Sequence, residues 1–221
     1  MTKSLKDKLV LEPVAPDDIT LRSVSKPVKI SEIKSAKIQR IIQAMIDYSN
    51  STQGDGTKRT TVGASAPQFG INKRITMVDV IATGIPGEQD LRVYINPEIT
   101  FMSREFEDGR EGCFSTSFVC GIVSRSKSVT IRAYNPKGEL VEETYFGFPA
   151  RVFQHEIDHL DGICFPDRIT NDDNLHWVEA DEFGDYRINW KTWTKKCPRE
   201  KWEAIKYGKE YSKLSSSHKT V

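Results

Sequence analysis

Cysteine and long apolar runs are scarce in this chain of 221 residues, and each scarcity excludes a class of protein. Four cysteines, none of them in a CxxC pair, are too few for a disulfide scaffold or a four-cysteine zinc ribbon. No apolar run is long enough for a transmembrane helix, and none follows the charged N-terminus as in a secretory signal. We therefore expect a cytoplasmic protein without a membrane partner.

Net charge is also nearly absent, because 32 Lys and Arg residues balance 31 Asp and Glu residues to a net charge of +1. A chain without an overall field has no general attraction to nucleic acid, so we expect no direct DNA role. With 38% hydrophobic and 29% charged residues, the composition is typical of a soluble globular protein.

Two segments predict helices. In residues 38–46, apolar side chains recur every three or four positions, which gives one apolar face, and Ser31 is the expected N-cap. A second helix is expected over residues 149–160, with an Asp-Gly pair directly after it as the C-cap signal.

Short runs rich in β-branched and aromatic residues predict strands between the two helices. Gly, Pro and Asn residues separate them: a hairpin turn is expected at 135–138, and further turns at 84–87 and 96–97. A polar loop is expected at 49–60. The predicted strands are residues 75–80, 92–95, 128–134 and 142–146. A helix, several strands and a helix in this order indicate the α+β class.

Changes in composition and charge divide the chain into an N-terminal arm (1–17), a main domain (18–169) and a charged C-terminal extension (170–221). Around the second boundary, residues 167–185 hold seven acids and one base, whereas residues 191–221 hold nine bases and three acids. All four tryptophans lie in the extension, at Trp177, Trp190, Trp193 and Trp202. The extension is therefore expected either to fold over the core with tryptophans as anchors or to dock on RNA.

The predicted second helix contains an HExxH pattern. His155 and His159 are four residues apart and share a helix face, so both imidazoles can reach one metal ion. Glu156 lies one step around the helix, where it can hold a water or accept its proton.

Two histidines do not complete a catalytic site, which usually has three protein ligands and a water. The sequence lacks the HExxHxxGxxH extension that would supply a third histidine. Glu179 or Glu182 downstream, or Cys113 upstream between Gly and Phe, could serve instead.

Three blocks in order resemble the motifs of the peptide deformylase family. Residues 154–162 read QHEIDHLDG, against QHExDHLDG in the family, and residues 111–115 read EGCFS, against EGCLS. Residues 61–70 read TVGASAPQFG, against GxGxAAPQxG. The resemblance covers about residues 18–169 and implies mixed β-sheets packed around a central HExxH helix, followed by a C-terminal extension.

This resemblance implies that Cys113, His155 and His159 bind one divalent metal per chain, most readily Fe²⁺, with Zn²⁺ or Ni²⁺ accepted. It also implies that Glu156 moves a proton. An oxyanion hole is implied at the side chain of Gln68 and the backbone N–H of Phe114. The substrate-binding residues are expected to be Gly63, Glu111, Gly112, Phe148 and Val152.

The implied activity is removal of the N-formyl group from the formyl-methionine of newly made polypeptides, with release of formate. Three departures from the family pattern leave an alternative open, a related metal hydrolase with another acyl-amine substrate. They are Thr61 for Gly, Ser65 for Ala, and Cys120 at the position where the family often has a substrate-contacting Arg. A second alternative is a module that contacts the ribosome through the extension, with catalysis secondary.

Overall fold

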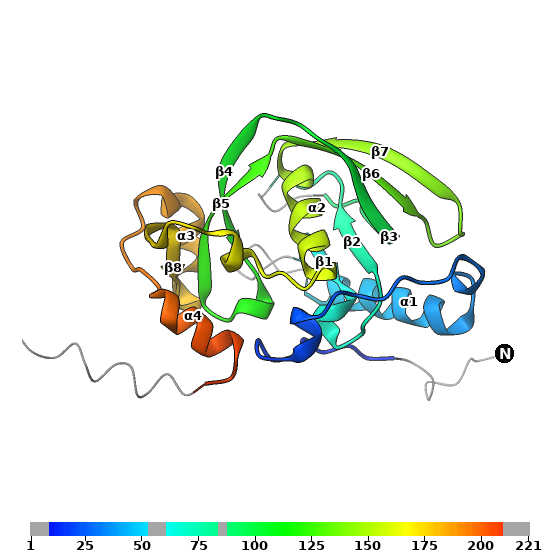
Figure 1. Ribbon diagram of the computed structural model, residues 1–221, viewed down its shortest axis with the longest axis horizontal. Helices are drawn as coiled ribbons and strands as arrows, with labels where there is room; N and C mark the ends of the chain where they lie inside the picture. The colour runs from blue at the N-terminus through cyan, green and yellow to red at the C-terminus, as the bar shows by residue number, and fades with distance from the viewer. Residues whose placement is uncertain (1–8, 53–60, 84–87, 210–221) are drawn as a thin grey trace, which may run out of the picture.

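The computed structural model describes residues 9–52, 61–83 and 88–209 (Figure 1). Within these residues, no helix combines the length and the apolar character that crossing a membrane requires. The predicted turn at 84–87 and most of the predicted loop at 49–60 lie outside the described residues.

Two antiparallel sheets hold one helix, α2 (Gly147–Leu160), between them (Figure 1). The first sheet has the order β1-β2-β3-β6-β7 and the second has the order β4-β5-β8. The strands are β1 (Gly63–Ser65), β2 (Ile75–Asp79), β3 (Leu91–Met102), β4 (Phe106–Gly112), β5 (Val119–Ser126), β6 (Ser128–Tyr134), β7 (Leu140–Phe146) and β8 (Leu175–Trp177). This arrangement confirms the predicted α+β fold with sheets packed around the HExxH helix, although the strand pairs of both sheets are antiparallel and the sheets are not mixed.

The remaining helices flank the sheets. They are α1 (Ala36–Ser51), α3 (Phe183–Asn189) and α4 (Arg199–Lys206). Short 3-10 turns lie at Ile19–Arg22, Ile30–Glu32, Ala66–Phe69, Phe114–Thr116, Phe165–Arg168, Asp172–Asn174, Ala180–Glu182 and Trp190–Thr192.

The start of α1 corrects one prediction. Ser35, not Ser31, is the N-cap, because the Ser35 side chain accepts a hydrogen bond from the Ile38 N–H while residues 30–32 form a separate 3-10 turn. The predicted apolar face is confirmed, since Ile38, Ile41, Ile42 and Met45 are buried in the core and Ile46 is partly buried against it.

One of the two described turns predicted between strands is wrong. The hairpin at 135–138 is confirmed, but the turn predicted at Asn96–Pro97 is a bulge inside the long strand β3. Asn96 has a φ of 52°, and the register with β6 shifts between Ile95 and Glu98. A bulge and a turn use the same residue types, so local sequence does not distinguish them.

The C-terminal end of α2 follows the expected glycine signal, whereas the helix begins two residues before the predicted start. Gly147 opens the helix at a φ of 59°, and Gly162 follows it at a φ of 76°. A side chain at position 162 would lie 2.8 Å from the Arg22 backbone, so only glycine fits this left-handed C-cap.

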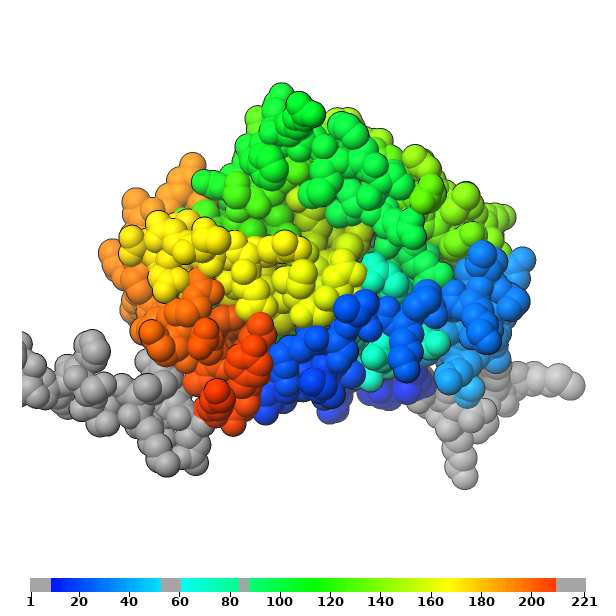
Figure 2. Space-filling view, in the orientation of Figure 1, coloured from blue at the N-terminus to red at the C-terminus, as the bar shows by residue number. Residues whose placement is uncertain are grey.

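The described part of the C-terminal extension, residues 170–209, packs on the same core as the main domain. β8 pairs with β5, and Trp202 of α4 is 1% exposed in a cluster with Leu21 and Cys113. The space-filling view shows this segment against the N-terminal residues (Figure 2), where Arg22 donates to the Lys206 carbonyl at 2.6 Å.

Ion pairs join the basic half of the extension to acidic residues on both sides of the predicted boundary at 169. Arg199 binds Asp172 at 2.7 Å and Lys206 binds Asp167 at 2.8 Å. The expectation of an extension folded over the core on tryptophan anchors therefore agrees with the structure, whereas the domain boundaries at 17 and 169 stay predictions. Of the predicted arm, Leu11 is buried.

Replacing Trp202 with Ala should lower the free energy of unfolding by about 3–5 kcal/mol, because a large buried side chain is lost and a cavity remains. Ile188→Ala, at a side chain that is 79% exposed, is the matched control and should change little. Urea denaturation monitored by far-UV circular dichroism measures both. Equal stability of the Trp202 variant and the wild type would contradict the anchoring role.

Candidate metal centre and active site

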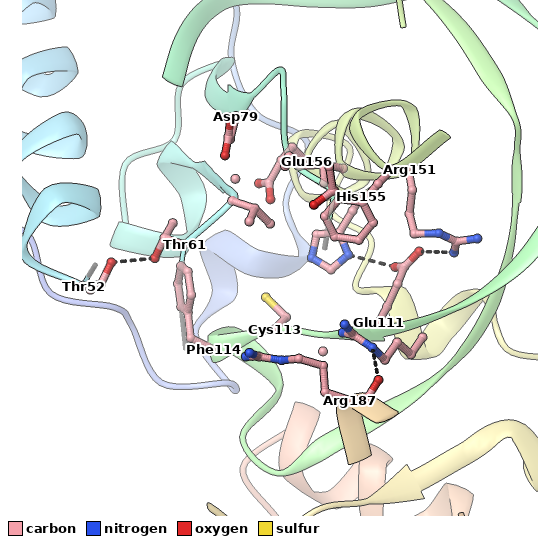
Figure 3. Close-up of a pocket in the computed structure, with 18 of the residues that line it drawn as sticks. Thr52, Thr61, Asp79, Glu111, Cys113, Phe114, Arg151, His155, Glu156 and Arg187 are labelled. Carbon is pink, nitrogen blue, oxygen red and sulfur yellow. Dashed lines mark hydrogen bonds and ion pairs between the residues drawn. The ribbon is translucent and has the colours of Figure 1, made fainter. Parts of the chain in front are cut away.

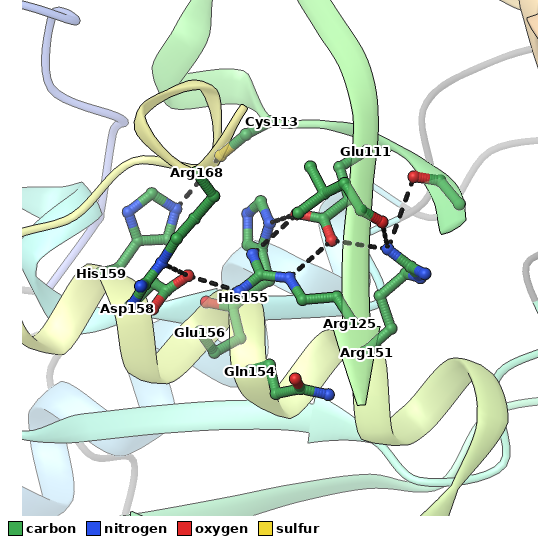
Figure 4. A network of polar contacts seen from close by, with 12 residues as sticks. Glu111, Cys113, Arg125, Arg151, Gln154, His155, Glu156, Asp158, His159 and Arg168 are labelled. Carbon is green, nitrogen blue, oxygen red and sulfur yellow. Dashed lines mark hydrogen bonds and ion pairs between the residues drawn. The ribbon is translucent and has the colours of Figure 1, made fainter. Parts of the chain in front are cut away.

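Three side chains converge on one point beside α2. Cys113 follows β4 at the start of a 3-10 turn, and His155 and His159 face it from the helix. Their donor atoms lie within 4.8 Å of one another, and the Cys113 Sγ is 3.4 Å from the His159 Nε2 (Figure 4).

These distances fit a metal site. Sulfur and nitrogen ligands on one tetrahedral metal lie about 3.6 Å apart at ordinary bond lengths. The alternative third ligands lie elsewhere: Glu179 accepts from the Trp177 indole, and Glu182 is paired with Lys195. Cys113, His155 and His159 therefore could hold a divalent ion, as the resemblance implied.

The surroundings of Cys113 favour its thiolate. Burial opposes ionisation, but the charge of His159 and hydrogen bonds from both histidines outweigh it and hold the pKa of the thiol well below its usual value. The Gln68 Nε2 donates to the sulfur at 3.1 Å, and the Ser115 N–H donates at 3.4 Å. A thiolate is the form that binds metal.

Glu111 joins His155 to two buried arginines (Figure 4). Its carboxylate lies 2.9 Å from the His155 Nδ1, 2.9 Å from the Arg125 Nε and 3.0 Å from the Arg151 Nη1. Burial raises the pKa of Glu111, but the Arg125 charge and the hydrogen bond with His155 outweigh it and hold the pKa well below its usual value. The contact at Nδ1 leaves the His155 Nε2 to face the metal position.

Arg125 continues this network to a second carboxylate. It binds Asp158 on α2 at 2.6 Å, and Arg168 binds the other oxygen of Asp158 at 2.6 Å. The Glu111 carboxylate, expected from the sequence to contact substrate, is thus surrounded by protein groups, and its contacts support a role in orienting His155.

Glu156 lies on the face of α2 that meets β1. The Ser65 hydroxyl, a departure from the family pattern, lies 2.8 Å from the Glu156 Oε2. Burial raises the pKa of Glu156 above its usual value, which favours a carboxyl that can carry a proton. Gly63 is required for this packing, since a Cβ there would lie 2.7 Å from the Glu156 Oε1 and from Val152.

Two hydrogen-bond donors flank Cys113. Gln68 is 1% exposed, and its Oε1 accepts from the Ser65 N–H at 2.7 Å, which aims its amide nitrogen at the sulfur. Phe114 is the first residue of its 3-10 turn, so its N–H has no acceptor inside that turn. Both donors can meet negative charge that develops beside the metal position.

A pocket of about 620 Å³ opens over this centre (Figure 3). All of the site residues expected from the sequence line it except His159, which is fully buried behind the others. These lining residues are Gly63, Gln68, Glu111, Gly112, Cys113, Phe114, Phe148, Val152, His155 and Glu156.

Sequence reasoning missed one wall of this pocket. Arg110 from β4 and Phe183, Tyr186 and Arg187 from α3 also line it. The three α3 residues belong to the extension, and no motif relates so short and polar a segment to the metal ligands. Cys120, another departure, packs against Tyr186.

Replacing Cys113 or His159 with Ala should reduce the bound metal to less than about a tenth, because three ligands are the minimum for a tight site. Cys197→Ala removes a different buried cysteine and should leave the metal content unchanged. Plasma emission spectrometry on dialysed protein measures the metal. Full occupancy in the Cys113 and His159 variants would contradict the ligand assignment.

Glu111→Gln should destabilise the protein by about 3–5 kcal/mol at neutral pH, since the buried Arg151 loses its counter-charge and the buried Arg125 loses one of its two carboxylate partners. Because folding lowers the pKa of Glu111, the wild-type advantage exists above the unfolded pKa of about 4.3 and declines as the pH falls below it. Denaturation between neutral and acid pH tests this, with Glu107→Gln on the exposed face of β4 as control. A difference independent of pH would argue against the charge as its cause.

Comparison with known proteins agrees with this geometry. A family model described as polypeptide deformylase matches residues 12–174. The peptide deformylase of Thermotoga neapolitana is 43% identical over 153 residues, which cover 69% of this chain and 82% of that protein. That of Desulforudis audaxviator is 38% identical over 155 residues, covering 70% and 90%.

Solved structures give the same result. The class I type b peptide deformylase of Acinetobacter baumannii, bound to Met-Ala-Ser, is 34% identical, with a TM-score of 0.65 over 73% of this chain and 99% of that one. The Thermotoga maritima peptide deformylase has a TM-score of 0.58 at 36% identity, over 74% and 99%. The chain therefore belongs to the polypeptide deformylase family.

Proposed function

We propose that this enzyme removes the formyl group from the N-terminal formyl-methionine of newly made polypeptides and releases formate. The observation that carries the proposal is the convergence of Cys113, His155 and His159 with Glu156 beside them at the base of one pocket. Membership of the deformylase family supports the same substrate class. The cytoplasm, where such chains are made, is the proposed location.

A divalent metal at the three ligands, which we propose to be Fe²⁺, would supply a Lewis acid that polarises the formyl oxygen and makes a water acidic. The chain's own groups complete the reaction. Glu156 accepts a proton from the water that adds to the formyl carbon, and passes it to the peptide nitrogen as the C–N bond breaks. The Gln68 amide and the Phe114 N–H donate to the formyl oxygen as it gains charge.

The substrate chain can lie between two sheet edges. β1 is the edge of the five-stranded sheet and β4 is the edge of the three-stranded sheet, and both border the pocket. An extended peptide finds unpaired backbone groups at such edges. Phe148 and Val152 provide an apolar surface for the methionine side chain.

A second and less specific proposal is that the extension contacts ribosomal RNA through its basic residues. Several of these cations are paired within the protein, as in Arg199 with Asp172 and Lys206 with Asp167, which reduces the charge left for RNA. Co-sedimentation with ribosomes that falls steeply as salt rises would support the contact.

Glu156→Gln should keep the metal but release formate at least about 100-fold more slowly, because the amide cannot carry the proton. Formate released from formyl-Met-Ala-Ser by Fe²⁺-reconstituted protein measures the rate, and Glu107→Gln is the control. Undiminished turnover in the Glu156 variant would contradict its role, and no formate from the wild type would contradict the proposed function.

Anaerobically purified protein should contain iron and lose activity in air, whereas the zinc- or nickel-substituted protein should keep its activity, because the ferrous ion and its thiolate ligand are oxidisable. Metal analysis and activity before and after exposure to air test this. Purified protein that holds zinc alone and is stable in air would contradict the assignment of Fe²⁺.

A further inference from the structure

Two arginines at one end of the pocket have no part in the reaction described above. Arg110 lies on β4 and Arg187 lies on α3, and both line the pocket with Cys113. The Arg110 Nε donates to the Arg187 carbonyl oxygen at 3.2 Å, which holds the two residues side by side. In Figure 3, Arg187 reaches beneath Cys113 and Phe114, at the opposite end of the pocket from Asp79.

The charges of the two arginines repel each other. Burial, followed by the charge of Arg187, lowers the pKa of Arg110. Among the described residues, no Asp or Glu forms an ion pair with Arg187. The nearby Glu111 is already bound to His155 and to two other arginines. This end of the pocket therefore favours an anionic occupant.

The position of the pair along β4 indicates which part of a peptide it meets. Arg110 precedes Cys113 by three residues, which corresponds to about 10 Å along an extended strand. A peptide that lies along the β4 edge with its formyl group at Cys113 covers that distance with its second or third residue.

We propose that Arg110 and Arg187 bind a carboxylate on the substrate, carried by an acidic side chain at the second or third residue of the formylated chain. The planar guanidinium suits a carboxylate, and two of them distinguish it from a neutral amide. The inference rests on the proposed deformylation. Arg187 belongs to the extension and lies outside the region that matches the family model. The proposed contact would therefore make the extension contribute to substrate selection.

The test uses reconstituted full-length enzyme and amidated formyl peptides with Asp or Asn at the second or third residue: formyl-Met-Asp-Ala, formyl-Met-Asn-Ala, formyl-Met-Ala-Asp and formyl-Met-Ala-Asn. We expect a KM at least about tenfold lower for an Asp peptide than for its Asn counterpart, with similar kcat, since the contact is made equally before and during reaction. The preference should weaken as salt rises.

Variants assign the preference to the arginine pair. Arg187→Ala should bring the ratio of the two KM values close to one, and Arg187→Lys should keep part of it. Lys191→Ala removes an exposed charge from the same segment outside the pocket, and should keep the whole ratio. Calorimetric binding of the products Met-Asp-Ala-amide and Met-Asn-Ala-amide repeats the comparison without turnover.

Equal KM values for Asp and Asn peptides, or a ratio that Arg187→Ala leaves intact, would overturn the proposal without affecting deformylation. The same peptides with a free C-terminal carboxylate are measured beside the amides, and a preference seen only for the free acids would overturn the acidic side chain as the source. If no peptide releases formate, deformylation itself fails, and the calorimetric comparison still decides whether the arginines bind a carboxylate.

Discussion

The rest of the site depends on one buried carboxylate. Glu111 stands on β4 and holds β5 through Arg125 and α2 through Arg151 and His155. A buried charge is stable only when its hydrogen-bonding capacity is filled, and here cations and N–H donors surround it on both oxygens. The same carboxylate thus orients the metal ligand His155 and holds the second sheet against the helix.

Short-range chemistry made half of this site predictable. The spacing of His155 and His159 fixes their common face on any helix, and the helix itself follows from local residues with a glycine end signal. Cys113 is different, because it precedes His155 by 42 positions and this spacing alone leaves the distance between the two side chains open. Only the joint occurrence of three motifs identified it.

The unpredicted half has physical reasons too. β4 reads FEDGREG and carries no β-branched residue, since an edge strand exposed to solvent can be polar. α3 has seven residues, too few for a periodic pattern. Ser31 and Ser35 are the same residue type four positions apart, so the residue type does not show which of them caps the helix. The wall formed by Arg110 and Arg187 therefore became visible only in three dimensions.

The cluster that contains both Cys113 and Trp202 links metal binding to the stability of the C-terminal extension. A metal that binds the folded chain but not the unfolded one adds its binding energy to folding. Because the cysteine ligand and the tryptophan anchor share their neighbours, the same energy should oppose local release of α4. The rate at which a protease cleaves the extension thereby becomes a measure of how much of the enzyme carries its metal.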